Sequence, residues 1–326
     1  MTSSKGQLRG ADAVTTAIGS EATAEEDEVE AGSLAAWIAR FGGKTLVYAL
    51  LILWTVIALF PIYWTLSTSM KLGRDVTQGH LIPWVDFSPA WKGWQSLGLS
   101  PDTIFATSNV REEFLKKFIN SVICSFGAAA VAVVLGSLAA YGLSRFEYKF
   151  GPWRNRDILF FFVSQLILPP VVLALPFLVL YKALALLDTR VGLILVYTLM
   201  VLPIVIWVMR DQFDTIPQEM EQAALVDGCS IWGAFVRIVL PMAAPGMVAA
   251  FILSLILCWN EAFWSINLTS AKAGTLAVFI AAFSNPQGLF LAKLSAASLL
   301  AIAPILVFGW AAQRQLVRGL TFGAVK

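Results

Sequence analysis

The chain has 326 residues, of which 58% are hydrophobic and 13% are charged, whereas soluble domains carry about a quarter charged residues. This composition is typical of a protein that spans a membrane. The formal net charge of +2, without a run rich in Lys or Arg, gives no reason to expect nucleic acid as a partner.

The N-terminal segment is polar and acidic. It contains EATAEEDEVE, in which six of ten residues are acidic. Such a segment buries too little apolar surface to fold, and it lacks the apolar stretch of a signal peptide. We therefore expect residues 1–45 to form a largely disordered tail.

Six apolar stretches follow, and each is long enough for a spanning helix, which needs about 20 residues without charges. They are residues 46–66, 118–143, 158–180, 191–209, 243–264 and 294–312. The pattern predicts an all-α, polytopic membrane protein with six transmembrane helices over residues 46–312 and a short tail over 313–326. Prolines are expected to kink the third, fourth and sixth helices. These prolines are Pro169, Pro170, Pro176, Pro203 and Pro304.

Basic residues predict the orientation, because short loops rich in Lys and Arg stay on the cytoplasmic side. They follow the second helix and the sixth, at Arg145, Lys149, Arg154, Arg156, Arg314, Arg318 and Lys326. Both termini are therefore expected in the cytoplasm, and the loop 67–117 is expected outside. Tryptophans of that loop, such as Trp84, fit an aromatic belt at the membrane interface, with a partner-binding surface as the alternative.

The sequence offers no catalytic or metal site. Cys124, Cys229 and Cys258 lie far apart and His80 is the sole histidine, so the spacing of metal ligands is absent. The stretch IARFGGKT resembles the end of a phosphate-binding loop, but Ile38 stands where the first glycine is required. We expect neither a metal nor a nucleotide on this chain. A membrane enzyme is disfavoured because no predicted span contains a histidine or a pair of acidic residues.

The segment 210–242 is a polar interruption between the fourth and fifth helices, on the cytoplasmic side by this topology. Local signals predict two short helices in it. Thr215 is expected as the N-cap of the first and Gly228 as its C′ residue, whereas Ser230 caps the second and Pro241 ends it.

The segment IPQEMEQAALVDGCSIWGAFVRIVLP closely resembles the EAA loop of ATP-binding-cassette importer permeases, whose pattern runs from E-x-A-x-x-x-D-G to I-x-L-P. The matching residues are Glu221, Ala223, Asp227, Gly228, Ile238, Leu240 and Pro241. The stretches FINSVICSFGAAAVAVVLGSLAAYGLSRF, CWNEAFW and QRQLVRGLTFGAVK extend the resemblance to carbohydrate-importer permeases similar to the second membrane subunit of the maltose transporter. Gln222, Cys229, the acidic tail and the enlarged loop 67–117 depart from that pattern.

The resemblance implies a permease subunit of an ATP-driven, binding-protein-dependent importer in the bacterial cytoplasmic (inner) membrane. The solute would be carbohydrate-like: a sugar, oligosaccharide, polyol or glycoside. Such a permease works in a heteromeric complex with a second, related permease, two ATPase subunits and an extracytoplasmic solute-binding protein. ATP and Mg would be bound by the ATPase subunits.

The resemblance also implies that the EAA helix docks into a cleft of the ATPase, where Glu221 meets a basic group. A helix with small residues suits such close docking. The residues expected to couple transport to ATP hydrolysis are Glu221, Ala223, Ala224, Asp227 and Gly228.

Glu261 is the single carboxylate inside a predicted span, and an ionisable residue there is costly unless it has a function. One interpretation is a solute path in which Asn260 and Glu261 bind sugar hydroxyls while Trp259 or Phe263 stacks on the ring. The alternative places Glu261 at the headgroups or against a partner subunit, with the tryptophan in the aromatic belt.

The remaining alternative is an ion-coupled secondary transporter of a small polar solute. It would require polar relays at the membrane midplane and inverted repeats, and neither is visible in the sequence. Uptake after ATP depletion with the ion gradient intact separates the two functions, because only the secondary transporter continues.

Overall fold

The computed structural model describes residues 44–282 and 288–321, so most of the predicted N-terminal tail and the last five residues lie outside the described residues. The chain divides into two compact units, Met1–Trp64 and Thr65–Lys326. The described part of the first unit is residues 44–64. They belong to the helix Lys44–Ser69, which has a mean hydropathy of 2.3 over its most apolar stretch. All other helices and strands belong to the second unit.

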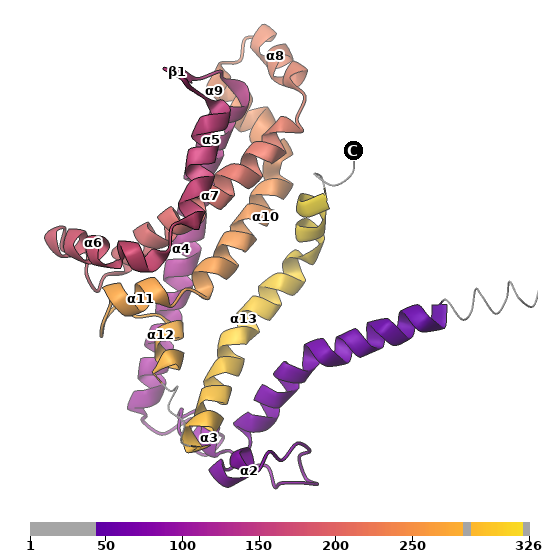
Figure 1. The fold of residues 1–326 in the computed structure, drawn as a ribbon, viewed down its shortest axis with the longest axis vertical. Helices are drawn as coiled ribbons and strands as arrows, with labels where there is room; N and C mark the ends of the chain where they lie inside the picture. The colour runs from indigo at the N-terminus through magenta and orange to yellow at the C-terminus, as the bar shows by residue number, and fades with distance from the viewer. Residues whose placement is uncertain (1–43, 283–287, 322–326) are drawn as a thin grey trace, which may run out of the picture. The chain divides into compact units, whose positions relative to one another are not determined.

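Three long helices form the core of the second unit (Figure 1): α4 (Asn109–Arg145), α7 (Arg190–Asp214) and α10 (Leu240–Trp259). Small residues recur every fourth position on α4, which places them on one buried face. They are Ala128, Ala132, Gly136 and Ala140. A Cβ atom on Gly136 would lie 2.6 Å from Cγ1 of Val205, so α4 and α7 are packed as closely as a glycine permits.

The last long helix, α13 (Gly288–Thr321), packs on α10 and on two short helices that precede α4. It continues past residue 312, where the sequence pattern ends the sixth span. Apart from a bent pair of helices between β2 and α7, the remaining elements of the second unit are short. They are α2 (Gly73–Thr77), α3 (Lys92–Gln95), the hairpin β1 (Lys149–Phe150) and β2 (Trp153–Arg154), α8 (Gln218–Val226), α9 (Ile231–Ala234), the π-helical turn η2 (Phe235–Val239), α11 (Phe263–Leu268) and α12 (Leu276–Ala281).

Within the described ranges, five helices are long and apolar enough to cross a membrane. They are Lys44–Ser69, Asn109–Arg145, Arg190–Asp214, Ile231–Trp259 and Leu291–Trp310. A sixth crossing is added if one bent pair of helices crosses as a unit. The mostly helical architecture is therefore confirmed, with five or six candidate crossings.

The bent pair corresponds to the third predicted span. Here α5 (Asn155–Ser164) and the 3-10 turn η1 (Gln165–Ile167) are followed by α6 (Pro170–Ala183), and the two parts meet at 94°. The break follows from the Pro169-Pro170 pair, because a proline lacks the backbone donor and pushes the residue before it into extended backbone. By contrast, Pro203 and Pro304 lie inside continuous helices.

The prediction that Pro241 ends a separate short helix is wrong. From Ile231 to Trp259 the chain forms one helical stretch of 29 residues, in which α9 and α10 are joined by η2. Pro241 lies in the first turn of α10, directly after the π-helical turn, where a missing backbone donor is accommodated. The fifth span also ends at Trp259, before the predicted residue 264.

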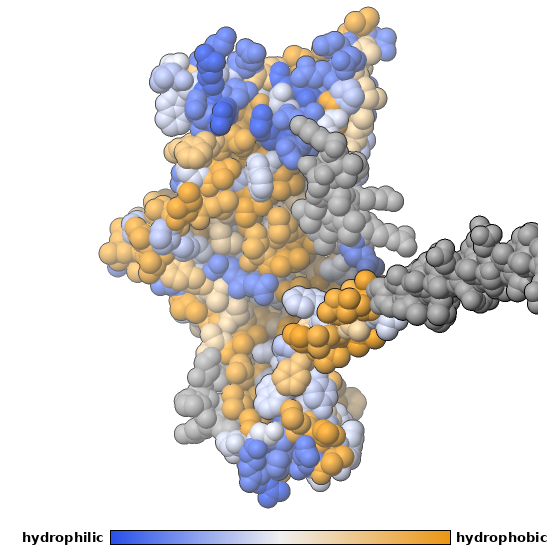
Figure 2. All heavy atoms as spheres, turned by 45° about the vertical axis from the view of Figure 1, so that its right-hand side comes forward, coloured by the Kyte–Doolittle hydropathy of each residue, from blue (hydrophilic) through white to orange (hydrophobic). Residues whose placement is uncertain are grey.

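Polar and apolar side chains are segregated along the second unit. Figure 2 shows hydrophilic side chains gathered over the end that carries α8, α9 and β1, and hydrophobic side chains over the helices next to it. An apolar surface of this extent fits lipid or a partner subunit rather than water.

Candidate functional site

The helix α8 begins after Pro217, and the prediction of Thr215 as its N-cap is wrong. Thr215 instead closes α7: its backbone N–H and its hydroxyl, at 2.7 Å, both donate to the carbonyl of Gln212. Extended backbone at Pro217, with ψ of 132°, then redirects the chain into α8. The proline, and not the threonine, sets the start of the helix.

The C-terminal end of α8 is closed as the sequence predicts. Gly228 has φ of +89°, its N–H donates to Leu225 O at 3.1 Å, and the next N–H, of Cys229, donates to Ala224 O at 2.9 Å. This pair of bonds is a Schellman motif, which favours glycine at the left-handed position. Ser230 also caps α9 as predicted, since its Oγ accepts from Gly233 N at 3.1 Å.

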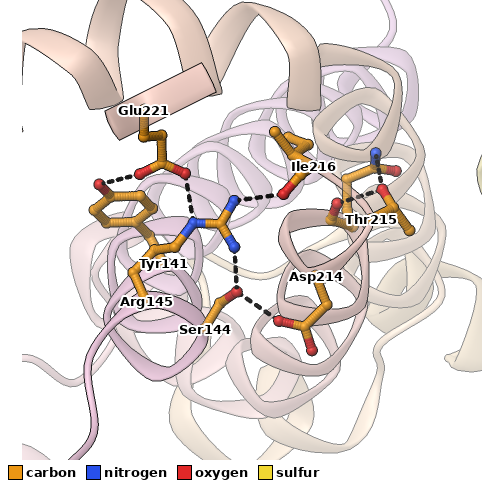
Figure 3. Close-up of polar contacts among 8 residues, drawn as sticks. Tyr141, Ser144, Arg145, Asp214, Thr215, Ile216 and Glu221 are labelled. Atoms are coloured by element: carbon orange, nitrogen blue, oxygen red, sulfur yellow. Dashed lines mark hydrogen bonds and ion pairs between the residues drawn. The ribbon is translucent and has the colours of Figure 1, made fainter. Parts of the chain in front are cut away.

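One face of α8 is buried, and Glu221 is its charged residue. Its side chain is only 10% exposed, and Ala224 is buried beside it. One carboxylate oxygen accepts a hydrogen bond from the Tyr141 hydroxyl at 2.9 Å, and the other forms an ion pair with Nε of Arg145 (Figure 3). The basic group that faces Glu221 in this structure therefore belongs to its own chain.

Arg145, the last residue of α4, binds more than Glu221. Its guanidinium also donates to the carbonyl of Ile216, in the link between α7 and α8, at 3.0 Å, and to Ser144 Oγ at 3.1 Å. Ser144 in turn donates to a carboxylate oxygen of Asp214 on α7 at 2.5 Å. Figure 3 shows these contacts radiating from the guanidinium, so one side chain joins α4, α8 and the intervening link.

The other face of α8 is exposed. Ala223, Asp227 and Gly228 lie on the surface, so the structure separates the five predicted coupling residues into two buried and three exposed. Large apolar side chains are exposed nearby: Met220 at 43%, Leu225 at 43%, Val226 at 88% and Trp232 at 63%. A cleft of about 160 Å³ opens between α8, α9 and the end of α4. Exposed apolar groups beside a cleft are typical of a protein-binding surface.

The four residues of the predicted solute path lie at the break between α10 and α11. Trp259 is buried, with its ring 5.7 Å from that of Phe118 and its indole N–H donating to Ala301 O at 3.1 Å. Asn260 is exposed and donates to Ile256 O at 2.8 Å.

Glu261 and Phe263 are half-buried at the same break. The Glu261 carboxylate accepts from Trp264 N at 3.0 Å, and its carbonyl accepts from the Tyr197 hydroxyl at 3.1 Å. The carboxylate thus caps α11 and stabilises the break. Of the two aromatic residues that were expected to stack on a sugar ring, Trp259 and Phe263, Trp259 has its ring packed in the core.

A second bound carboxylate, which the sequence analysis missed, lies between α6 and α7. Asp188 accepts from the backbone N–H groups of Ser270, Lys272 and Ala273 at 2.9 to 3.2 Å and from the Ser270 hydroxyl at 2.8 Å. The same loop receives hydrogen bonds from α4, since Asn120 donates to the carbonyls of Lys272 and Gly274 at 2.9 and 3.0 Å. These bonds fix the loop between α11 and α12.

A sequence model of the family described as binding-protein-dependent transport system inner membrane component matches residues 132–321. The trehalose transport system permease protein SugB of Mycobacterium tuberculosis is 34% identical, covering 82% of this chain and 93% of its own length. The sulfoquinovosyl glycerol transport system permease protein SmoH of Agrobacterium fabrum is 30% identical, covering 88% of this chain and 95% of its own.

The fold is also found among solved structures. A bacterial ABC transporter involved in the import of the acidic polysaccharide alginate contains a chain that matches with a TM-score of 0.64 at 20% identity. The match covers 85% of this chain and 96% of that one. At this level of identity the likeness concerns the fold.

Proposed function

The chain belongs to the family of binding-protein-dependent transport system inner membrane components, and on that premise we propose how it works and what it transports. It is a permease subunit of an ATP-driven importer. Its solute is carbohydrate-like, in keeping with relatives named for trehalose and for sulfoquinovosyl glycerol transport. An ion-coupled secondary transporter is not favoured.

The observation that carries the proposed coupling is the division of α8 into two faces. The inner face, with Glu221 and Ala224, is fixed to the helix bundle, and the outer face exposes Val226 and its apolar neighbours. A helix that is anchored on one side and apolar on the other is suited to dock on a partner and to transmit its movement. We assign the outer face to an ATPase subunit.

The proposal includes an assembly and an orientation. The chain pairs with a second, related permease and two ATPase subunits that bind ATP and Mg, and it receives solute from an extracytoplasmic binding protein. The end that carries α8 and the basic hairpin β1–β2 lies in the cytoplasm, as expected for loops rich in Lys and Arg. With six crossings, in which the bent pair of α5 and α6 crosses once, both termini then lie on the cytoplasmic side.

Association with the ATPase tests the docking face directly. Val226→Glu places a charge on the exposed face of α8 and is expected to lower the amount of ATPase that co-purifies with the permease by at least about tenfold, since desolvating an unpaired charge is costly. Val85→Glu is the matched control, because Val85 is 77% exposed and lies outside α8, in the segment between α2 and α3. Equal ATPase recovery with both variants would contradict the assignment.

We retain the break between α10 and α11 as the proposed solute-path position. Glu261→Gln preserves an oxygen that accepts from Trp264 N, so α11 stays capped while the charge is removed. Maximal uptake is expected to fall, with the affinity of the soluble binding protein for its solute unchanged. Normal uptake at normal abundance in the membrane would rule out a role for the charge.

A further inference from the structure

We infer that Arg145 is a positioning residue for transport: it ties α8 to α4, so that a movement imposed on α8 by the ATPase displaces α4. The inference rests on the proposed docking of α8. It assigns to Glu221 a partner within the chain, in place of a direct contact with the ATPase.

Burial makes this ion pair a firm connection. The side chains of Arg145 and Glu221 are 7% and 10% exposed, so separating them would leave two charges poorly solvated. The Tyr141 hydroxyl on the same carboxylate and the Ile216 carbonyl on the same guanidinium add bonds that depend on the same relative position of the helices. A displacement of α8 is therefore resisted unless the end of α4 follows.

The neighbouring surface pair shows what a weak connection looks like. Lys149 and Glu147 lie 3.7 Å apart just after α4, with side chains 74% and 89% exposed. Water solvates both charges whether or not they are paired, so this contact transmits little force. It provides a control in the same short segment.

The other half of α4 contacts the proposed solute-path break at Trp259 and the loop between α11 and α12. Phe118 packs edge-on against Trp259, Asn120 binds the carbonyls of Lys272 and Gly274, and the Ser121 hydroxyl accepts from Leu276 N at 2.8 Å. Because α4 is one continuous helix of 37 residues, a displacement at Arg145 reaches these contacts. The helix thus links α8 with the break between α10 and α11.

The test uses the assembled complex in lipid, with ATP hydrolysis measured with and without the solute-loaded binding protein. The Arg145→Gln complex is expected to retain its ATPase subunits. Its solute-stimulated rate of ATP hydrolysis should fall at least about tenfold, because the ion pair is needed for coupling and not for binding the ATPase. Arg145→Glu and Glu221→Arg should each fail similarly. The solute-stimulated rate of the double variant should exceed that of either single variant by about fivefold or more. It should stay below the rate of the parent, because the bond to the Ile216 carbonyl is not restored.

Several outcomes would overturn the inference. They are normal stimulation in Arg145→Gln, loss of the ATPase from that variant, or a double variant no better than the singles. If Arg145→Gln does not accumulate in the membrane, Arg145→Lys and the double variant replace it as the test. The lysine variant is expected to retain part of the solute-stimulated ATP hydrolysis, because it keeps the charge but not the fork of donors. Glu147→Lys should behave as the parent does. A parent complex that does not bind an ATPase would refute the proposed function instead.

Discussion

Two carboxylates hold the chain together at different places, and they are bound in different ways. Glu221 is bound by the side chains of Tyr141 and Arg145, both on α4. Asp188 is bound mainly by the backbone, through three N–H groups of the loop that follows α11. The first contact depends on which side chains another helix supplies, whereas the second depends mainly on the path of the loop.

The difference separates a connection that transmits movement from one that fixes a shape. The bonds to Glu221 depend on how α8 sits against α4, and a single substitution on either helix removes them. The bonds to Asp188 hold one loop in one conformation, and substituting the side chains of Lys272 or Ala273 would leave them intact. Two variants test this comparison directly, and two more test the ends of the helices beside these contacts; they follow in order of decreasing expected effect on stability.

Glu221→Lys should have the largest effect, because it places a second positive charge against Arg145. Breaking a buried pair costs about 3 to 5 kcal/mol, so we expect a clear fall in the midpoint of thermal unfolding of the detergent-solubilised complex. Glu219→Lys, on the exposed face of the same helix, is the control and should change the midpoint little. A midpoint for Glu221→Lys equal to that of the control would show that the pair is not a firm connection.

Asp188→Asn should cost about 2 kcal/mol, because an amide replaces the charged acceptor of several backbone N–H groups and brings its own donors toward them. Asparagine tolerates the left-handed backbone of this residue, with φ of 54°, so the variant changes the acceptor without adding backbone strain. The measurement is the rate of proteolysis in the loop 269–275, which should rise. An unchanged rate would mean that the loop is held by its other contacts, such as those from Asn120.

Asp188 also gives this loop a pH dependence. Burial raises the pKa of the carboxyl, but the hydrogen bonds from Ala273, Ser270 and Lys272 outweigh it and hold the pKa well below its ordinary value of 3.8. A lowered pKa in the folded state contributes stability that is fully present above the ordinary carboxyl range and is lost as the pH falls below it. Above about pH 5 the carboxyl is ionised in the folded and in the unfolded chain, so the ratio of the proteolysis rate of the asparagine variant to that of the parent should not change between about pH 5 and 8.

Gly228→Leu should cost about 1 kcal/mol or somewhat more, confined to α8, because its φ of +89° is unfavourable for any residue with a Cβ atom. Space is not the cause, since no atom lies within 4 Å of the position of such a Cβ. Hydrogen exchange of the α8 amides measures the local effect. If the variant also loses solute-stimulated ATP hydrolysis while α8 remains protected, close approach of the ATPase at Gly228 is the explanation.

Ala185→Gly should have the smallest effect and the opposite sign. Ala185 occupies the same Schellman position after α6 that Gly228 occupies after α8, with φ of 55° and bonds from its own N–H and from Leu186 N to Lys182 and Tyr181 carbonyls. Glycine there removes a strain of about 1 kcal/mol, partly offset by the greater freedom of the unfolded chain. A rise of the unfolding midpoint of the complex is expected, and a fall would contradict this account.

Local features were predictable from the sequence, and contacts between distant segments were not. Gly228 and Ser230 act through bonds to residues within four positions, so their roles follow from their immediate neighbours. The prediction for Thr215 was wrong because only three residues separate the end of α7 from the start of α8. A threonine at this place can cap either helix. The pairing of Arg145 with Glu221 joins residues 76 positions apart, and Arg145 was recognised only as a charge that sets orientation.

The helical architecture followed from uncharged stretches of spanning length, but the lengths of the helices did not. In α4 the helix begins at Asn109, well before the apolar stretch, because Ser108 caps it through a bond from Arg111 N at 3.3 Å. The 94° bend before α6 was foreshadowed by its two prolines, although a proline alone gives no angle. Pro203 shows this, since α7 continues through it.

The close packing at Gly136 gives these connections a mechanical consequence. Because α4 and α7 meet there without room for a methyl group, a movement of one helix toward the other is blocked at this point. The two helices reach α8 twice, through the peptide link at Thr215 and Ile216 and through the side chain of Arg145. Among the described residues, α4, α7, the link and α8 therefore form a closed loop of contacts, and a force applied to α8 reaches the same two helices by two routes.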